Sequence, residues 1–126
     1  MSFCLIAGAL SVSLATSSLT LAWSHSVEHQ LWEEDWRLEK GLLVLDAARV
    51  RGSGAGMEAG EDAVLKDGAW QWHPRVAPLE KIVLRRSGAT ADYRLCIRGA
   101  CKPLSALLPL EADPVALRAC PKGMPR

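Results

Sequence analysis

The sequence predicts an all-β fold, namely a single small antiparallel sandwich or a partly open barrel of about eight strands. Two observations predict it: apolar and polar residues alternate in short runs, and turn residues such as Gly, Pro and Asp separate these runs. The 126 residues suffice for one domain, and with 49% hydrophobic residues the chain is too apolar to be disordered. No uninterrupted apolar run reaches the ~18 residues of a transmembrane helix. We expect the domain to span residues 1–110 and a tail, with a short turn or helix, to span 111–126.

The first apolar segment, residues 3–15, allows two interpretations. Its end, Ala15-Thr16-Ser17, resembles a signal-peptide cleavage site, but no basic residue precedes the apolar segment. Residues 10–14 alternate like a half-buried strand. We favour a strand, and a processed signal over residues 1–17 is the alternative, which would remove Cys4.

Two alternating runs, residues 19–28 and 31–39, predict a central hairpin. We expect a pairing that places Trp23 opposite Trp36 and His25 opposite Glu34. Apolar residues then face apolar residues, and an imidazole meets a carboxylate. A slip by one residue would set tryptophan beside arginine and aspartate, so we expect the register to be strongly specified.

A third strand over 42–50 is predicted after a three-residue loop, Glu39-Lys40-Gly41. Glu34 would then face Asp46, and His25, Glu34 and Asp46 would form a polar row on a tryptophan-lined face. Such a row is destabilising unless its members are paired or functional.

Three interpretations of this polar row remain open. His25 and Glu34 could form a buried hydrogen bond that specifies the register, or they could anchor a ligand or partner between tryptophan walls. The third is a metal site of His25, Glu34 and Asp46, with or without His29. Catalysis by a Ser-His-Asp triad is disfavoured, because the neighbouring serines point to the other face from His25. We therefore predict no catalytic residue and no cofactor.

The glycine-rich segment 52–57 is interpreted as a connection between strands. A phosphate cradle is the alternative, since Gly54 and Gly56 expose backbone N–H groups. The segment lacks the Lys-Ser/Thr ending of a P-loop and does not open an evident helix.

Later in the chain, Asp67-Gly68 predicts a hairpin that is followed by Trp70 and Trp72. Residues 82–86 and 91–97 predict two more strands around Ser87-Gly88.

The four cysteines predict two disulfides. A hairpin that turns at Arg98-Gly99 places Cys96 and Cys101 in a non-hydrogen-bonded pair, with Cα atoms about 4.5 Å apart. The second disulfide joins Cys4 to Cys120, from the first strand to the tail. Zinc is the less favoured alternative, because four residues separate Cys96 from Cys101 and no histidine flanks them. Disulfides indicate an oxidising compartment, which in a bacterium is the periplasm or the cell surface.

The net charge of +1 hides an acidic and a basic part. Residues 28–67 carry ten acidic and five basic side chains, and residues 68–126 carry four acidic and ten basic ones. The basic part lacks the clustered cations and interleaved aromatics of a nucleic-acid-binding protein. We expect acidic and basic strands of one fold to face each other.

The segment Trp23-Ser24-His25-Ser26-Val27-Glu28, then Glu33-Glu34-Asp35-Trp36 and Gly54-Ala55-Gly56-Met57, resembles the bacterial domain-of-unknown-function family 1850. The resemblance spans roughly residues 4–108 and implies a small β-rich protein. Members are often encoded beside TRAP transporters of the TAXI subclass, which implies an extracytoplasmic accessory role and assigns no reaction. The resemblance carries the family motif onto His25, Ser26, Val27, Glu28, Glu33 and Glu34. The start of the chain departs from the clear signal or anchor that an exported member would carry.

We therefore predict a non-enzymatic, extracytoplasmic binding or accessory domain that works with a membrane transporter or its solute-binding protein. Two alternatives are a metal-dependent or His/carboxylate enzyme and a purely structural interaction protein. The predicted ligand- or partner-binding residues are His25, Ser26, Glu28, Glu34, Trp23, Trp32, Trp36, Gly54 and Gly56.

Overall fold

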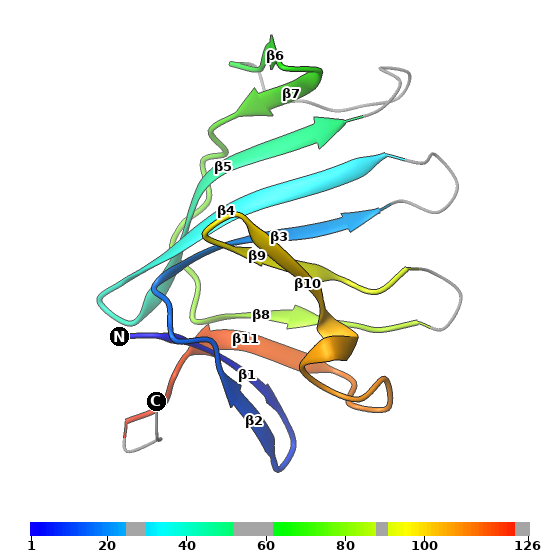
Figure 1. The fold of residues 1–126 in the computed structure, drawn as a ribbon. Coiled ribbons are helices and arrows are strands. Elements are labelled where there is room, and N and C mark those ends of the chain that lie inside the picture. Colours follow the sequence, from blue (N-terminus) through cyan, green and yellow to red (C-terminus); the bar gives the residue numbers. More distant parts are fainter. Residues whose placement is uncertain (25–29, 52–61, 88–90, 123–126) are drawn as a thin grey trace.

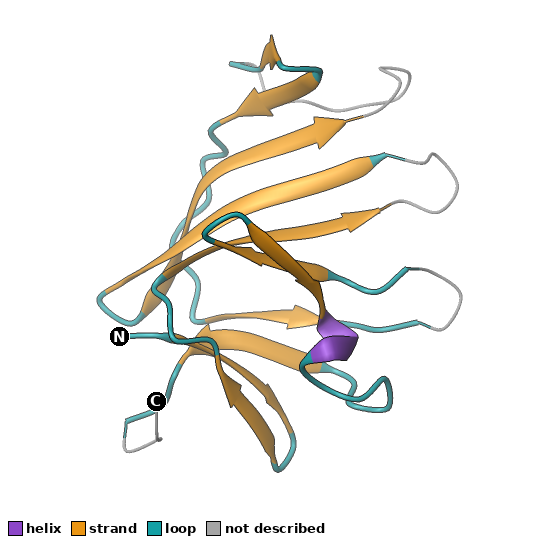
Figure 2. Ribbon diagram, viewed as in Figure 1, coloured by secondary structure: helices purple, strands orange, loops and turns teal. Residues whose placement is uncertain are grey.

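The computed structural model describes residues 1–24, 30–51, 62–87 and 91–122. Figure 1 shows strands almost throughout this part of the chain, and Figure 2 shows the short 3-10 helix Leu104–Ala106 among them. No helix among the described residues has the length and apolar character needed to cross a membrane.

Two antiparallel sheets face each other without closing into a barrel, which confirms the predicted all-β class (Figure 1). The smaller sheet has the order β2-β1-β11-β8, and the larger has the order β10-β9-β3-β4-β5-β7-β6. The described part thus holds eleven strands rather than about eight. Their bounds are β1 Phe3–Ala7, β2 Leu10–Ser13, β3 Ser18–Ser24, β4 Leu31–Glu39, β5 Leu42–Arg51, β6 Val64–Lys66, β7 Ala69–Trp72, β8 Lys81–Leu84, β9 Arg94–Ile97, β10 Ala100–Pro103 and β11 Val115–Ala119.

Both ends of the chain contribute strands to the smaller sheet. Residues 3–13 form the hairpin of β1 and β2, as the strand interpretation predicted. β11 lies between β1 and β8, so the expected turn or helix was wrong for Val115–Ala119. Val115 and Leu117 are fully buried and alternate with more exposed neighbours, which is the pattern of a strand with one face on the core.

The predicted strands around Ser87 belong to different sheets. β8 pairs with β11 in the smaller sheet, whereas β9 pairs with β3 and β10 in the larger one. The chain therefore crosses from one layer of the sandwich to the other between them.

Two-residue turns connect three of the hairpins in the larger sheet. Lys40-Gly41, Asp67-Gly68 and Arg98-Gly99 all have positive φ at both positions, as type I′ turns require. The hairpin turns at Asp67-Gly68 and Arg98-Gly99 are confirmed. The expected three-residue loop at Glu39-Lys40-Gly41 was wrong, because Glu39 itself pairs with Leu42.

The register between β3 and β4 differs from the predicted one. Trp23 lies opposite Trp32, Leu21 opposite Glu34, and Leu19 opposite Trp36. The strands have slid by four residues from the expected pairing of Trp23 with Trp36. An even slide keeps every side chain on its face, so alternation could not distinguish the two registers. The observed one joins two tryptophans as a cross-strand pair.

A β-bulge in β5 changes the next register. Trp36 pairs with Leu45 and Asp35 with Ala47, so Asp46 is the extra residue. Glu34 consequently lies opposite Ala48, and the expected pairing of Glu34 with Asp46 was wrong.

The hydrophobic core lies between the two sheets. Phe3, Leu5 and Leu117 of the smaller sheet are fully buried, as is Leu43 of β5 in the larger sheet. Leu104 of the 3-10 helix is also fully buried, and its amide donates to the Tyr93 carbonyl at 2.8 Å.

Both predicted disulfides are present. Cys96 and Cys101 face each other across the β9–β10 hairpin with Cα atoms 3.9 Å apart, and Cys4 of β1 is bonded to Cys120 just after β11. The second bond joins positions 116 residues apart, so it links the beginning of the described chain to its end.

Candidate binding site

Four aromatic rings form a continuous row on the inner face of the larger sheet. Trp23 stacks on Trp32 with ring centroids 6.4 Å apart and an interplanar angle of 9°. Tyr93 tilts against Trp23 at 6.3 Å, and Trp72 meets Trp32 edge to face at 6.1 Å. The row therefore runs from the residue before β9, over β3 and β4, to the end of β7.

The row begins at the hydrophobic core and extends away from it. Trp23 and Tyr93 pack against the core cluster, whereas Trp32 and Trp72 are not part of that packing. All four side chains are only partly buried. Beneath the rings, Val50 is fully buried because it lies opposite Trp32 on one side and Trp70 on the other. The tryptophans thus cover the sheet while leaving part of their own surface exposed.

Glu34 is the acidic residue within this aromatic face. It lies between Leu21 and Ala48 in its cross-strand row, and Ala48 in turn lies opposite Trp72. Ala48, which has only a methyl group, is buried between Glu34 and Trp72. The indole Nε1 of Trp36 donates to Glu34 Oε1 at 3.2 Å.

The electrostatics of this face follow from burial. Loss of solvent raises the pKa of the Glu34 carboxyl, and the hydrogen bond from Trp36 opposes this only in part. Burial also raises the pKa of Tyr93, to which the negative charges of Asp92 and Glu34 add. The Glu34 carboxylate therefore acts electrostatically on Tyr93.

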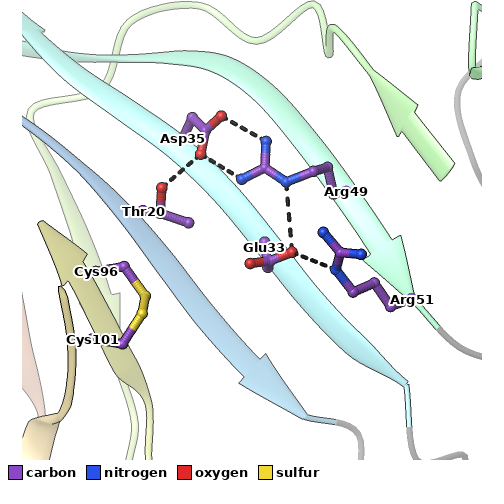
Figure 3. Close-up of a disulfide and its surroundings, with 7 residues drawn as sticks. All are labelled: Thr20, Glu33, Asp35, Arg49, Arg51, Cys96 and Cys101. Atoms are coloured by element: carbon purple, nitrogen blue, oxygen red, sulfur yellow. Dashed lines mark hydrogen bonds and ion pairs between the residues drawn. A yellow bond between two sulfur atoms is a disulfide. The ribbon is translucent and has the colours of Figure 1, made fainter. Parts of the chain in front are cut away.

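The opposite face of the same strands carries a network of paired charges (Figure 3). Asp35 accepts two hydrogen bonds of 2.7 Å from the Arg49 guanidinium and a third from the Thr20 hydroxyl, also at 2.7 Å. Glu33 lies 3.5 Å from Arg49 and accepts a bond of 3.1 Å from Arg51. The hydrogen bonds from Arg49 hold the pKa of Asp35 below its usual value.

This outer face is not the acidic-to-basic contact that the charge asymmetry predicted. The acidic residues of β4 are paired with Arg49 and Arg51, which belong to the same acidic part of the sequence. The Cys96–Cys101 disulfide borders the network, because Cys96 lies opposite Thr20 (Figure 3). The carboxylates and guanidinium groups of the network are paired with one another, so the face suits a structural role.

A second paired charge lies beside the aromatic row. The Arg86 side chain, only 3% exposed, bonds Asp92 at 2.8 Å and also donates to the backbone carbonyls of Leu108 and Ala112. Its neighbour Arg85 lies 3.5 Å from Asp113. A hollow of about 80 Å³ separates these groups from Trp23 and Tyr93. The arginines there are thus already matched by aspartates.

The structure brings together only some of the predicted site residues. Trp23, Trp32 and Glu34 share the aromatic face, as their alternation predicted. Trp36 is 5% exposed in the core and contributes its indole N–H rather than a wall. His25, Ser26, Glu28, His29, Gly54 and Gly56 lie outside the described residues.

The predicted polar row of His25, Glu34 and Asp46 was wrong in its pairing. Glu34 faces the sandwich interior, whereas Asp46 bonds Arg37 at 2.9 Å on the outer face. The bulge at Asp46 moves its side chain to the side opposite Glu34. Among the residues placed by the structure, no group of three or more His, Cys, Asp or Glu side chains could hold a metal ion.

Sequence reasoning missed Trp72 and Tyr93. Trp72 follows Trp70 at strand spacing after the Asp67-Gly68 turn, but alternation alone does not reveal that β7 pairs with β5. Tyr93 lies two residues before the buried Leu95. Strand alternation therefore places both side chains on the same face, and this alternation could have identified Tyr93.

This arrangement has the chemistry of a binding surface. Partly exposed rings offer flat apolar surfaces, and one carboxylate provides a fixed charge among them. Among the described residues, the Glu34 carboxylate accepts its hydrogen bond from the indole N–H of Trp36.

Comparisons with known proteins identify one family. No match was found among curated proteins or among solved structures. Residues 19–104 match the family described as Domain of unknown function (DUF1850). The matched segment contains the four aromatic residues of the row, Glu34 and almost all of the seven-stranded sheet, whereas β1, β2 and β11 lie outside it. By this match over more than half of its length, the chain belongs to the DUF1850 family.

Proposed function

We propose that this protein is an extracytoplasmic accessory domain that binds a small solute on the aromatic face around Glu34, beside a TRAP-type transporter of the TAXI subclass. The observation that carries the proposal is the chemistry of that face. A carboxylate is held half-buried among partly exposed aromatic rings, although its burial raises its pKa and so opposes its charge. Carboxylates with perturbed pKa values cluster at functional sites, which supports a ligand site here.

Two further observations support the location and the context. The two disulfides suit an oxidising compartment, and all four cysteines are used in them. The transporter association rests on the resemblance to the family, whose members are often encoded beside such transporters.

The test is solute uptake in cells that express the partner transporter. We expect deletion of the gene to lower uptake, wild-type protein to restore it, and Glu34→Gln to leave it low. Glu33→Gln is the matched control, because the same substitution then changes a carboxylate on the opposite face. Uptake that is unchanged by deletion, or restored equally by both variants, would overturn the proposal.

A further inference from the structure

We propose that the solute bound on the aromatic face is a small organic cation, a quaternary or methylated ammonium compound whose charge lies beside Glu34. This inference rests on the proposed function, since it names the class of ligand for the same site.

The first argument is that the charge of Glu34 is not balanced within the described structure. Every ion pair found among the described residues lies elsewhere, and Glu34 takes part in none of them. The residues directly across from it are Leu21 and Ala48, which are uncharged. The arginine beside the aromatic row, Arg86, is already neutralised by Asp92.

The second argument is the electrostatics of the rings. The face of an aromatic ring is negative, so it attracts cations, and tryptophan does so most strongly. Trp23, Trp32 and Trp72 form a connected surface, and Glu34 is two residues from Trp32 on the same strand. Rings and carboxylate therefore favour the same sign of charge.

The third argument disfavours anions and metal ions as the ligand. An anion would meet both the carboxylate and the negative ring faces. A metal ion needs several oxygen or nitrogen ligands, and the described residues offer no group of three or more such side chains. A weakly hydrated organic cation loses little solvation free energy on leaving water, and both the aromatic rings and the Glu34 carboxylate attract it.

Ligand class can be tested by titrating the full-length oxidised protein with choline and with its uncharged isostere 3,3-dimethylbutan-1-ol. Isothermal calorimetry should be done at low salt in a buffer without organic cations. We expect choline to bind at least about tenfold more tightly than the isostere, which has the same shape and no charge. Glutarate and maltose serve as an anion and a neutral sugar.

Two variants assign the binding to this face. Glu34→Gln keeps the size of the side chain and should weaken choline binding about tenfold, whereas Glu33→Gln should leave it unchanged. Trp32→Leu should also weaken it, with circular dichroism showing that both Glu34→Gln and Trp32→Leu remain folded.

The outcomes separate the two proposals. Equal binding of choline and its isostere, an unaffected Glu34→Gln variant, or binding of maltose or glutarate alone would overturn the cation assignment. If choline fails to bind while uptake still depends on Glu34, the proposed function stands and only the ligand class is wrong. If choline binds through Glu34 while uptake is indifferent to it, the transport role fails.

Discussion

Glu34 and Asp35 are neighbours on β4, yet the protein treats their two carboxylates in opposite ways. Asp35 points to the outer face, where Arg49 and Thr20 bind it and Arg49 lowers its pKa. Glu34 points to the inner face, where burial raises its pKa and an indole is its hydrogen-bond donor. One strand thus carries a charge that the fold stabilises beside a charge that opposes folding.

This difference is consistent with a structural role for Asp35 and with the proposed ligand-binding role for Glu34. A carboxylate with a bidentate arginine partner is accounted for by the fold it holds together. A half-buried carboxylate whose pKa is raised needs another explanation, because a neutral residue of the same size would be more stable there. The ion pairs of the outer face are thus accounted for by the fold, and the raised pKa of Glu34 supports the proposed ligand site on the inner face.

The largest expected effect is that of Asp35→Asn. The change removes the charge that Arg49 pairs with. We expect the free energy of unfolding to fall by about 1–2 kcal/mol at neutral pH, a range that allows for the partial exposure of the pair. Since the folded pKa of Asp35 is lowered, its stabilisation exists above the unfolded pKa and disappears as pH falls through the folded pKa. Urea unfolding of both proteins between neutral and acidic pH measures this. An identical loss at every pH would contradict it, and Asp46→Asn, an exposed carboxylate, is the control.

The opposite sign is expected for Glu34→Gln, which should stabilise the protein by about 0.5–1 kcal/mol at neutral pH. Because the folded pKa of Glu34 is raised, the wild-type contribution is full below the unfolded pKa and is lost as pH rises through the folded pKa. The variant resembles the protonated acid. Its free energy of unfolding therefore increases relative to that of the wild type as pH rises, and the two proteins are equally stable in acid. Thermal unfolding across pH measures the gain. A destabilised variant at neutral pH would show that the fold needs the charge.

Much of the fold was predictable from local patterns. Alternation identified the β class, and two-residue turns with glycine identified two hairpins. The Arg98-Gly99 turn fixed the geometry that makes Cys96 and Cys101 partners. These features depend on a few adjacent residues, and no distant pairing is needed to read them.

Registers and distant pairings were not predictable in this way. A slide of four residues between β3 and β4 keeps every side chain on its face, so alternation cannot detect it. The bulge at Asp46 likewise depends on pairing across the sheet. The kinds of residue on the aromatic face were therefore predicted. Trp72 and Tyr93 were missed because β7 pairs with β5, and β9 with β3, only through the tertiary fold.

The smallest expected effect, that of Arg51→Ala, tests whether the outer network shares its charges. Arg51 is 42% exposed on its side chain, and its removal leaves Glu33 near Arg49 at 3.5 Å. Exposed ion pairs contribute little, so we expect a change of no more than about 0.5 kcal/mol in the free energy of unfolding. A loss as large as that of Asp35→Asn would mean that Glu33 depends on Arg51 alone. The outer face would then hold a second poorly balanced carboxylate, and imbalance of charge would no longer distinguish Glu34 from its neighbours on β4.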